Sequence, residues 1–322
     1  MAVYTRIGAE EMAALIDSFD VGALVSAKGI AEGVSNSNWL VETQRGRFIL
    51  TMYEERTDVA DLPFFLGLLD HLAAAGCPVP ATIHDRTGAA FQTLSCKGRD
   101  KAVALIEFLP GVSADRPTAA QAHAVGSALA GVHLSALAFA MRRTDAMGPA
   151  AWLRFATSCA GRWQEIDARL SAIPDHLARI AAQWPADLPS SVIHADLFPD
   201  NVLLLDGRVS GLIDFYFACN GPMAYDLAVT HAAWSFDSQG RAFDAALGDA
   251  LLNGYETVRP LAASERAALP VLAQAASLRF ALTRAYDWLN TPPDALVTRK
   301  NPVEFFNRLE FYARSGAAVF AP

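Results

Sequence analysis

The sequence predicts a two-lobed α+β protein, and three observations lead to this fold class. Short apolar runs separated by turn residues, typical of strands, dominate the first third of the chain. From Thr118 onward, apolar residues recur mostly at helical spacing. One hairpin signal, the dipeptide Asp206-Gly207 between two apolar runs, interrupts this helical part. We therefore expect a β-rich N-terminal lobe over residues 1–109 and a helical C-terminal lobe over residues 110–322.

The first third is expected to contain strands and two helices. Residues 10–19 have apolar side chains at helical spacing, and Asp20 and Gly22 end that helix. A second helix over residues 61–75 ends at Gly76-Cys77-Pro78. The predicted strands cover residues 24–30, 39–41, 48–53, 81–83, 89–94 and 102–108.

The remainder is expected to be mostly helical. Its predicted helices cover residues 118–138, 152–170, 174–184, a segment ending near Trp234, 241–258, 265–289 and 302–313. Gly126 and Gly131 lie inside the first of these and suggest a close contact with another helix. His133 lies on the apolar side of the same helix, so we expect a core histidine with a satisfied ring rather than a ligand.

Composition limits the class of protein. A hydrophobic content of 52% in 322 residues allows a large core, and a net charge of −8 argues against a nucleic-acid or anionic-membrane partner. No signal peptide and no apolar segment of membrane-spanning length is visible. The cysteines are widely spaced, which favours free thiols in a reducing cytoplasm: Cys77, Cys96, Cys159 and Cys219. We therefore expect a cytoplasmic protein.

The predicted hairpin brings polar residues together. If its turn has two residues, pairing backwards places Asn201 opposite Leu212, and Asp214 then shares a face with Asn201. Diagonal neighbours of this kind lie about 7–8 Å apart, so both can reach one ion. A carboxylate and an amide oxygen suit Mg²⁺, and we assign Asn201 and Asp214 as metal ligands. Asp196, on the loop before them, can accept a proton from a hydroxyl that attacks a phosphoryl group.

This metal site depends on the turn. A three-residue turn would shift the register by one and break the geometry. The alternative is a buried hairpin in which the Asp and Asn residues only cap turns.

The motif His194-x-Asp196-x₄-Asn201, followed by Ile213-Asp214-Phe215, resembles the catalytic loop and metal-binding Asp of protein-kinase-like phosphotransferases. Its form resembles the aminoglycoside phosphotransferase and choline kinase branch. This resemblance implies ATP and Mg²⁺ as cofactors, with Asp196 as catalytic base. It also implies that His194 and Asp226 support the catalytic loop.

The resemblance also assigns the nucleotide contacts. Small residues in the loop between the first two strands can offer backbone N–H groups to phosphates, so we expect Ser35, Asn36 and Asn38 to contact them, with a plain hairpin turn as the alternative. The end of the strand over residues 102–108 corresponds to a hinge that reads adenine, which implies Glu107 and Leu109. Thr51 stands where these enzymes carry a phosphate-binding Lys, and no pairing Glu is visible on the next helix. Either the protein is inactive, or other groups and Mg²⁺ neutralise the phosphates.

Longer stretches are similar to the bacterial homoserine kinases of the aminoglycoside-phosphotransferase-like type. They are residues 29–38, 48–54, 61–66, 214–220 and 298–306. The resemblance covers nearly the whole chain and implies transfer of the ATP γ-phosphate to the side-chain hydroxyl of L-homoserine, in threonine biosynthesis. That family also carries Thr at the position of the Lys. The alternatives are a kinase for choline, ethanolamine or an aminoglycoside, or a catalytically silent kinase-like binding module.

Homoserine is a zwitterion, so its site needs a cation for the carboxylate and acceptors for the ammonium group. The helix over residues 265–289 offers Arg279, Arg284 and Asp287 amid apolar residues. Arg binds a carboxylate through two parallel hydrogen bonds, and Asp287 shares a helix face with Arg284. We therefore predict that Arg279 or Arg284 binds the substrate carboxylate, with Asp287 near the ammonium. The alternative is a structural ion pair that joins this helix to the core.

Overall fold

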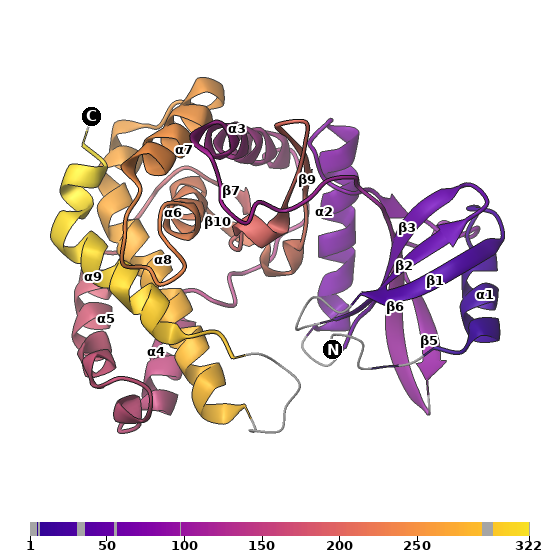
Figure 1. Cartoon of the computed structure of the whole chain (residues 1–322), viewed down its shortest axis with the longest axis horizontal. Helices are drawn as coiled ribbons and strands as arrows, with labels where there is room; N and C mark the ends of the chain where they lie inside the picture. Colours follow the sequence, from indigo (N-terminus) through magenta and orange to yellow (C-terminus); the bar gives the residue numbers. More distant parts are fainter. Residues whose placement is uncertain are drawn as a thin grey trace. The chain divides into compact units, whose positions relative to one another are not determined.

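The computed structural model describes residue 5 and residues 7–30, 36–54, 57–96, 98–291 and 299–321. The chain divides into two compact units, Met1–Pro110 and Gly111–Pro322 (Figure 1). The division falls one residue after the predicted boundary.

The first unit contains an antiparallel sheet with the strand order β1-β2-β3-β6-β4, and β5 pairs with β6. Its strands are β1 (Leu24–Ile30), β2 (Ser37–Thr43), β3 (Gly46–Met52), β4 (Thr82–Ile83), β5 (Gln92–Cys96) and β6 (Arg99–Glu107). Its helices are α1 (Ala9–Asp17) and α2 (Leu62–Ala74), preceded by a 3₁₀ turn over Val59–Asp61. These elements match the predicted order of strands and helices.

One face of this sheet forms the core with α1. Trp39, Leu50 and Val103 belong to this buried cluster, together with Ile16 of α1. Side chains alternate between the two faces along a strand. The directly paired residues Asn38 and Thr51 therefore lie on the opposite face from this core.

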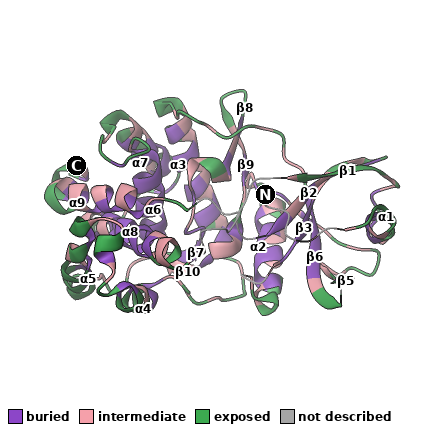
Figure 2. Cartoon of the chain, turned by 60° about the horizontal axis from the view of Figure 1, so that its bottom comes forward, coloured by how far each residue is buried: buried purple, intermediate pink, exposed green. Residues whose placement is uncertain are grey.

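The second unit packs helices around α6. Its helices are α3 (Ala119–Ala136), α4 (Pro149–Cys159), α5 (Ile173–Ala182), α6 (Met223–Trp234), α7 (Ala245–Val258), α8 (Ala263–Asn290) and α9 (Pro302–Val319). Every residue of α6 is buried, and the helix contacts α7, α8 and β7 (Figure 2). Two strand pairs complete the unit: β7 (Ser190–Ile193) with β10 (Cys219–Pro222), and β8 (Val202–Leu205) with β9 (Arg208–Leu212).

One predicted helix is wrong. Residues 152–170 do not form one helix, because α4 ends at Cys159 and Gly161 adopts the left-handed conformation with φ +77°. Short 3₁₀ turns over Trp163–Glu165 and Ala168–Ala172 follow. The cysteines are free, as predicted, and none of the described helices combines the length and apolar character needed to cross a membrane.

The predicted close helix contact is confirmed at Gly126 and wrong at Gly131. A Cβ at Gly126 would meet the Leu251 carbonyl of α7 at less than 3.0 Å, and one at Gly254 would meet the His123 carbonyl of α3 as closely. A Cβ at Gly131 would meet nothing within 4 Å. Helices α3 and α7 therefore cross with their backbones in close approach at two glycines.

Gly254→Ala is expected to destabilise the protein by about 1–3 kcal/mol, because the new methyl group overlaps backbone that cannot rotate away. Urea unfolding followed by circular dichroism measures this free energy. The matched control is Gly131→Ala, which adds the same methyl group in open space and should stabilise α3 by up to about 1 kcal/mol. Equal effects of the two substitutions would contradict the close approach.

Candidate active site

The hairpin carries the predicted two-residue turn, but its register differs from the prediction. Leu205 pairs with Arg208, and Asp206 and Gly207 both have positive φ, as the expected turn requires. A β-bulge follows, so that Leu212 pairs with Val202 instead of Asn201. The prediction that Asn201 and Asp214 share a strand face is therefore wrong.

The bulge lies beside a segment from outside the hairpin. Val112 pairs with Leu204 through two backbone hydrogen bonds, of 3.0 and 2.9 Å. The neighbouring Gly111 packs so closely that a Cβ there would lie 2.5 Å from Ser210 Oγ. A bulge leaves an extra residue unpaired and bends the strand, and Ser210 is that residue.

Asp214 is positioned by its backbone rather than by strand alternation. The Ile213 N–H donates to the Asn201 carbonyl over 3.0 Å, which continues the pairing by one residue. Asp214 then adopts the left-handed conformation, with φ 65° and ψ 58°, and a 3₁₀ turn over Phe215–Phe217 follows. Asp is among the few non-glycine residues that adopt this conformation with some frequency.

Asn201 is held with its amide nitrogen toward Asp196. Its Nδ2 donates to the Asp196 carbonyl over 2.7 Å and lies 3.4 Å from Asp196 Oδ2. Since the nitrogen is used in this way, the side-chain oxygen of Asn201 is the atom that can accept from, or coordinate, another group.

Two carboxyl groups of the site have raised pKa values. Burial raises the pKa of Asp196 to about 7, against an opposing effect of Arg279, and Asp214 raises it further. The surrounding protein displaces water from Asp214 and raises its pKa to about 6, and the charge of Asp200 raises it further. Part of Asp214 is nevertheless exposed. Asp200 raises the pKa of both carboxyl groups, and negative charges grouped in this way favour the binding of a cation near them.

His194 connects the loop before Asp196 to the segment before Asp214. The His194 ring is buried. Its Nε2 lies 2.9 Å from the Ile213 carbonyl oxygen, and its Nδ1 lies 3.2 Å from the backbone nitrogen of Asp196. A neutral ring that donates from Nε2 and accepts at Nδ1 satisfies both contacts. Burial lowers the pKa of His194, which agrees with a neutral ring.

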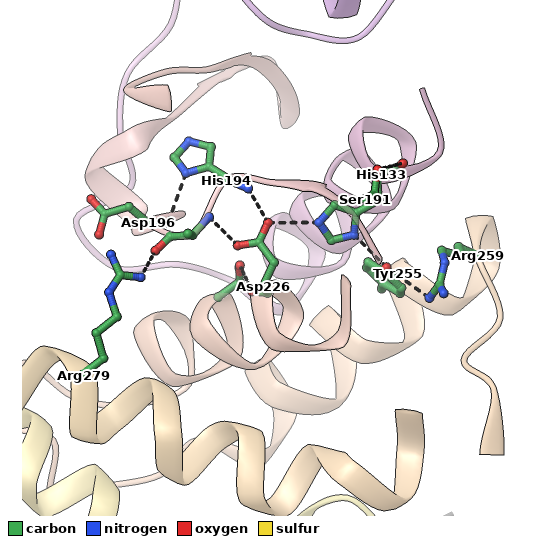
Figure 3. A network of polar contacts seen from close by, with 10 residues as sticks. His133, Ser191, His194, Asp196, Asp226, Tyr255, Arg259 and Arg279 are labelled. Atoms are coloured by element: carbon green, nitrogen blue, oxygen red, sulfur yellow. Dashed lines mark hydrogen bonds and ion pairs between the residues drawn. The ribbon is translucent and has the colours of Figure 1, made fainter. Parts of the chain in front are cut away.

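Asp226, in the first turn of α6, is hydrogen-bonded to the loop directly before Asp196. Its two oxygens accept from the backbone N–H groups of His194 and Ala195, each over 2.7 Å (Figure 3). Burial by itself would raise the pKa of Asp226, but the hydrogen bond from His133 and the two nearby histidines hold it below its ordinary value. Asp226 thus fixes two consecutive peptide groups directly before Asp196.

The prediction for His133 is confirmed. Its ring is fully buried, with Nε2 3.0 Å from Asp226 and Nδ1 2.8 Å from the Tyr255 hydroxyl. Arg259 donates to that hydroxyl over 3.3 Å and forms an ion pair with Glu265. A chain of polar contacts therefore runs from α8 through α7, α3 and α6 to the loop before Asp196.

The residues of the first unit that were predicted to bind the nucleotide have the following environments. Ser35 lies outside the described residues. Asn36 is buried, and its side-chain oxygen accepts from the Glu54 N–H and the Thr57 hydroxyl. Asn38 accepts from the Thr51 hydroxyl over 2.8 Å. Glu107 ends β6 and is hydrogen-bonded to Ala81, and the half-buried Leu109 follows two residues later.

The structure contains a Lys–Glu ion pair that the sequence did not suggest. Lys101 of β6 pairs with Glu54, which also accepts from the Ser37 hydroxyl over 2.7 Å. Lys101 precedes Val103 by two residues, so it shares the α1 face of the sheet, opposite to Thr51. This ion pair therefore does not take the place of the Lys that is missing at Thr51.

The predicted substrate residues of α8 have different environments. Arg279 is buried and donates to the Ala195 carbonyl. Arg284 forms an ion pair with Glu304 of α9 over 2.6 Å, which is the structural ion pair considered as the alternative. Asp287 is exposed.

Lys300 is a cation near the site that the sequence reasoning did not single out. Its ammonium lies 3.9 Å from Asp200, and its side chain is 57% exposed. Its charge lowers the pKa values of both Asp196 and Asp214. The only signal for it in the sequence is its place within residues 298–306, one of the stretches that carry the family resemblance.

Comparisons with known proteins agree on the class of chemistry. Residues 26–261 match the model of the Phosphotransferase enzyme family. A homoserine kinase of Xanthobacter autotrophicus is 48% identical and covers 97% of this chain and 96% of its own. A homoserine kinase of Azorhizobium caulinodans is 49% identical, with coverages of 99% and 98%.

Solved structures that resemble the chain include an amicoumacin kinase in complex with AMP-PNP and Ca²⁺. Its TM-score is 0.73 at 12% identity, and the similarity covers 96% of this chain and 94% of that one. A spectinomycin phosphotransferase in complex with ADP also has a TM-score of 0.73, at 14% identity and with coverages of 97% and 99%. These similarities confirm the predicted two-lobed α+β fold class.

Proposed function

The chain belongs to the phosphotransferase enzyme family. From its similarity to named relatives within that chemistry, we propose that it is a homoserine kinase. It transfers the γ-phosphate of ATP to the side-chain hydroxyl of L-homoserine and gives O-phosphohomoserine. The observation that carries this proposal is the near-full-length identity of 48–49% to relatives named homoserine kinase. The catalytic loop with Asp196 and Asn201 supports the same reaction type.

Asp196 is proposed to accept the hydrogen bond, and then the proton, of the attacking hydroxyl. Its backbone is fixed on both sides, because its N–H donates to His194 and its carbonyl accepts from Asn201. A pKa of about 7 suits a group that must be ionised before the reaction and hold a proton after it. Its half-buried side chain keeps access to a small substrate.

Asn201 and Asp214 are proposed to hold Mg²⁺ through one amide oxygen and one carboxylate. The donor set fits this ion, because Mg²⁺ binds hard oxygen ligands and takes its remaining ligands from waters and phosphates. The raised pKa of Asp214 supports a site that favours a positive charge. Bound Mg²⁺ would neutralise charge on the phosphates during transfer. We propose that phosphate oxygens of the nucleotide and waters complete the coordination of the ion.

Nucleotide binding in the first unit is proposed to involve the loop end at Asn36 and Asn38, the Thr51 hydroxyl, and the segment from Glu107 to Leu109. The net charge of −8 supports a small-molecule substrate rather than nucleic acid. The free cysteines and the family relationship support a cytoplasmic enzyme of threonine biosynthesis.

The carboxylate of homoserine is proposed to bind Lys300. Arg279 is buried and Arg284 is paired with Glu304, whereas the Lys300 ammonium is open to solvent near Asp196 and Asp200. Lys300 therefore replaces the two arginines in this role. Asp287 stays a proposed acceptor for the ammonium group.

The function is tested by measuring ADP release with homoserine, choline, ethanolamine and an aminoglycoside as acceptors. We expect Mg²⁺-dependent turnover with homoserine and kcat/KM values at least about 100-fold lower for the other acceptors. A site built for a zwitterion binds a carboxylate, and this part of the site stays unpaired when the acceptor is a cationic alcohol. Preference for a cationic alcohol would assign the protein to that other kinase class. The absence of turnover with every acceptor would indicate a binding module.

Lys300→Met is expected to raise the KM for homoserine about 10–100-fold, because it removes one charge-assisted contact of about 1.5–3 kcal/mol, and to leave the KM for ATP unchanged. Steady-state kinetics with each substrate varied measures both values. Arg299→Met is the matched control, since Arg299 is the adjacent exposed cation and its guanidinium stacks on Trp288. Similar effects of the two substitutions would show that a general loss of positive charge is responsible.

A further inference from the structure

Ala195, directly before Asp196, has an unusual backbone conformation, and the peptide groups on its two sides are held by neighbouring side chains. Ala195 has φ 63°, the left-handed region, which costs an L-residue other than Gly roughly 1–2 kcal/mol. Its N–H donates to Asp226 over 2.7 Å, and its carbonyl accepts from Arg279 Nη1.

Arg279 is built into the protein interior. Only 2% of the residue is exposed, and its guanidinium lies 4.6 Å from the ring centroid of Phe280 and 5.4 Å from that of Phe217. Phe217 belongs to the 3₁₀ turn directly after Asp214. One guanidinium therefore contacts the residue before Asp196 and the turn after Asp214.

The surroundings of Arg279 argue against two simpler roles. A side chain with 2% exposure offers no surface to the carboxylate of a substrate. In the part of the chain that the structure describes, no carboxylate lies within 4.0 Å of Arg279, so it is not half of a structural ion pair. Its Nε has no hydrogen-bond partner there either. A buried cation is costly unless it has compensating contacts. Arg279 donates to the Ala195 carbonyl, and the nearby charges of Asp196 and Asp145 favour its charged form.

We propose that Arg279 is a positioning residue for phosphoryl transfer, which holds the left-handed Ala195 peptide and the Phe217 turn so that Asp196 and Asp214 keep their orientation. The inference rests on the proposed function for the identity of the reaction, but the contacts themselves do not depend on the acceptor. Small displacements of catalytic groups lower turnover strongly, so the loss should appear in kcat rather than in substrate binding.

Arg308 offers a matched control within the same unit. It is 5% exposed, its guanidinium stacks over Phe305 and Phe236, and its Nε also has no partner among the described residues. Its hydrogen bond, however, goes to the Asp237 carbonyl, away from the catalytic loop. The two arginines therefore differ in which backbone carbonyl they hold and in the nearest charges, which include Asp196 for Arg279 and Arg284 for Arg308.

The test compares Arg279→Met with Arg308→Met, using whichever alcohol the wild-type protein phosphorylates. We expect both variants to lower the melting temperature. In Arg279→Met, kcat should fall about 100-fold, with the KM values for ATP and the alcohol within about threefold of wild type. In Arg308→Met, kcat should stay within about threefold. Equal losses of kcat, or a raised KM for the alcohol with unchanged kcat, would overturn the proposal. Failure of the wild type to use homoserine would count against the proposed function alone.

A second comparison separates positioning from folding. Arg279→Lys retains a cation that can donate to the carbonyl and should recover at least tenfold of the lost kcat. Ala195→Gly should also reduce the loss in the Arg279→Met background, because Gly adopts positive φ without the steric cost. If Arg279→Met does not fold, the same cycle is measured with Arg279→Lys. Strictly additive effects of the two positions on kcat would contradict the role given to Arg279.

Discussion

Asp196→Asn is expected to lower kcat by about 10³-fold or more, with the affinity for Mg-ATP within about threefold of wild type. The substitution keeps the shape of the side chain and removes its ability to take the hydroxyl proton, and such proton transfer contributes about 10²–10⁴-fold to rates. The backbone contacts of Asp196 with His194 and Asn201 do not involve the carboxylate and should persist. Steady-state kinetics gives kcat, and calorimetry gives the nucleotide affinity.

The matched control for this variant is Asp206→Asn. Asp206 lies in the turn of the hairpin that follows the Asp196 loop, is exposed, and has φ 50°, which Asn also tolerates. It should retain wild-type kcat. If Asp196→Asn retained it as well, another group would have to accept the proton.

Asp214→Asn is expected to weaken Mg-ATP binding at least about 100-fold. Mutating a residue that only hydrogen-bonds to a metal ligand already lowers metal affinity about 10–100-fold. Asp214→Asn removes the charge of the proposed ligand itself, so its effect should be at least as large. Asn rather than Ala is the informative substitution, because Asn adopts the left-handed conformation of Asp214 more readily.

The metal dependence of this effect is the control. Calorimetry with ATP in the presence of a chelator should give the same affinity for Asp214→Asn and wild type, so that the difference appears only when Mg²⁺ is added. An unchanged Mg-ATP affinity would show that the ion is held by other residues.

Local signals in the sequence predicted the fold class and the order of most elements. Asp206-Gly207 encodes its turn through residues that accept positive φ, and the spacing of Asp196 and Asn201 lies within one loop. The register beyond the turn could not be predicted from the hairpin alone, because no local signal marks the bulge at Ser210. The bulge lies beside Gly111 and Val112, roughly a hundred residues earlier. The placement of Asp214 depends on a left-handed backbone rather than on strand alternation.

The partners of Arg279 and Arg284 could not be predicted from the sequence either. Arg279 was a reasonable candidate for the substrate carboxylate, since Arg residues on an apolar helix often bind anions. Its partner is the backbone carbonyl of Ala195, 84 residues away. Every residue has such a carbonyl, so the sequence cannot indicate which one Arg279 binds. Arg284 likewise pairs with Glu304 rather than with a residue of its own helix.

The hydrogen bonds from the catalytic loop to Asp226 have a consequence for amide hydrogen exchange. Loop amides usually exchange quickly with solvent, because small local openings expose them. The N–H groups of His194 and Ala195 instead donate to a carboxylate on α6, a helix that is buried along its whole length. To release these protons, α6 must separate from the loop, which requires opening of the helical core around it. These two amides should therefore exchange as slowly as those of α6 itself, and their protection would report the global stability of the second unit.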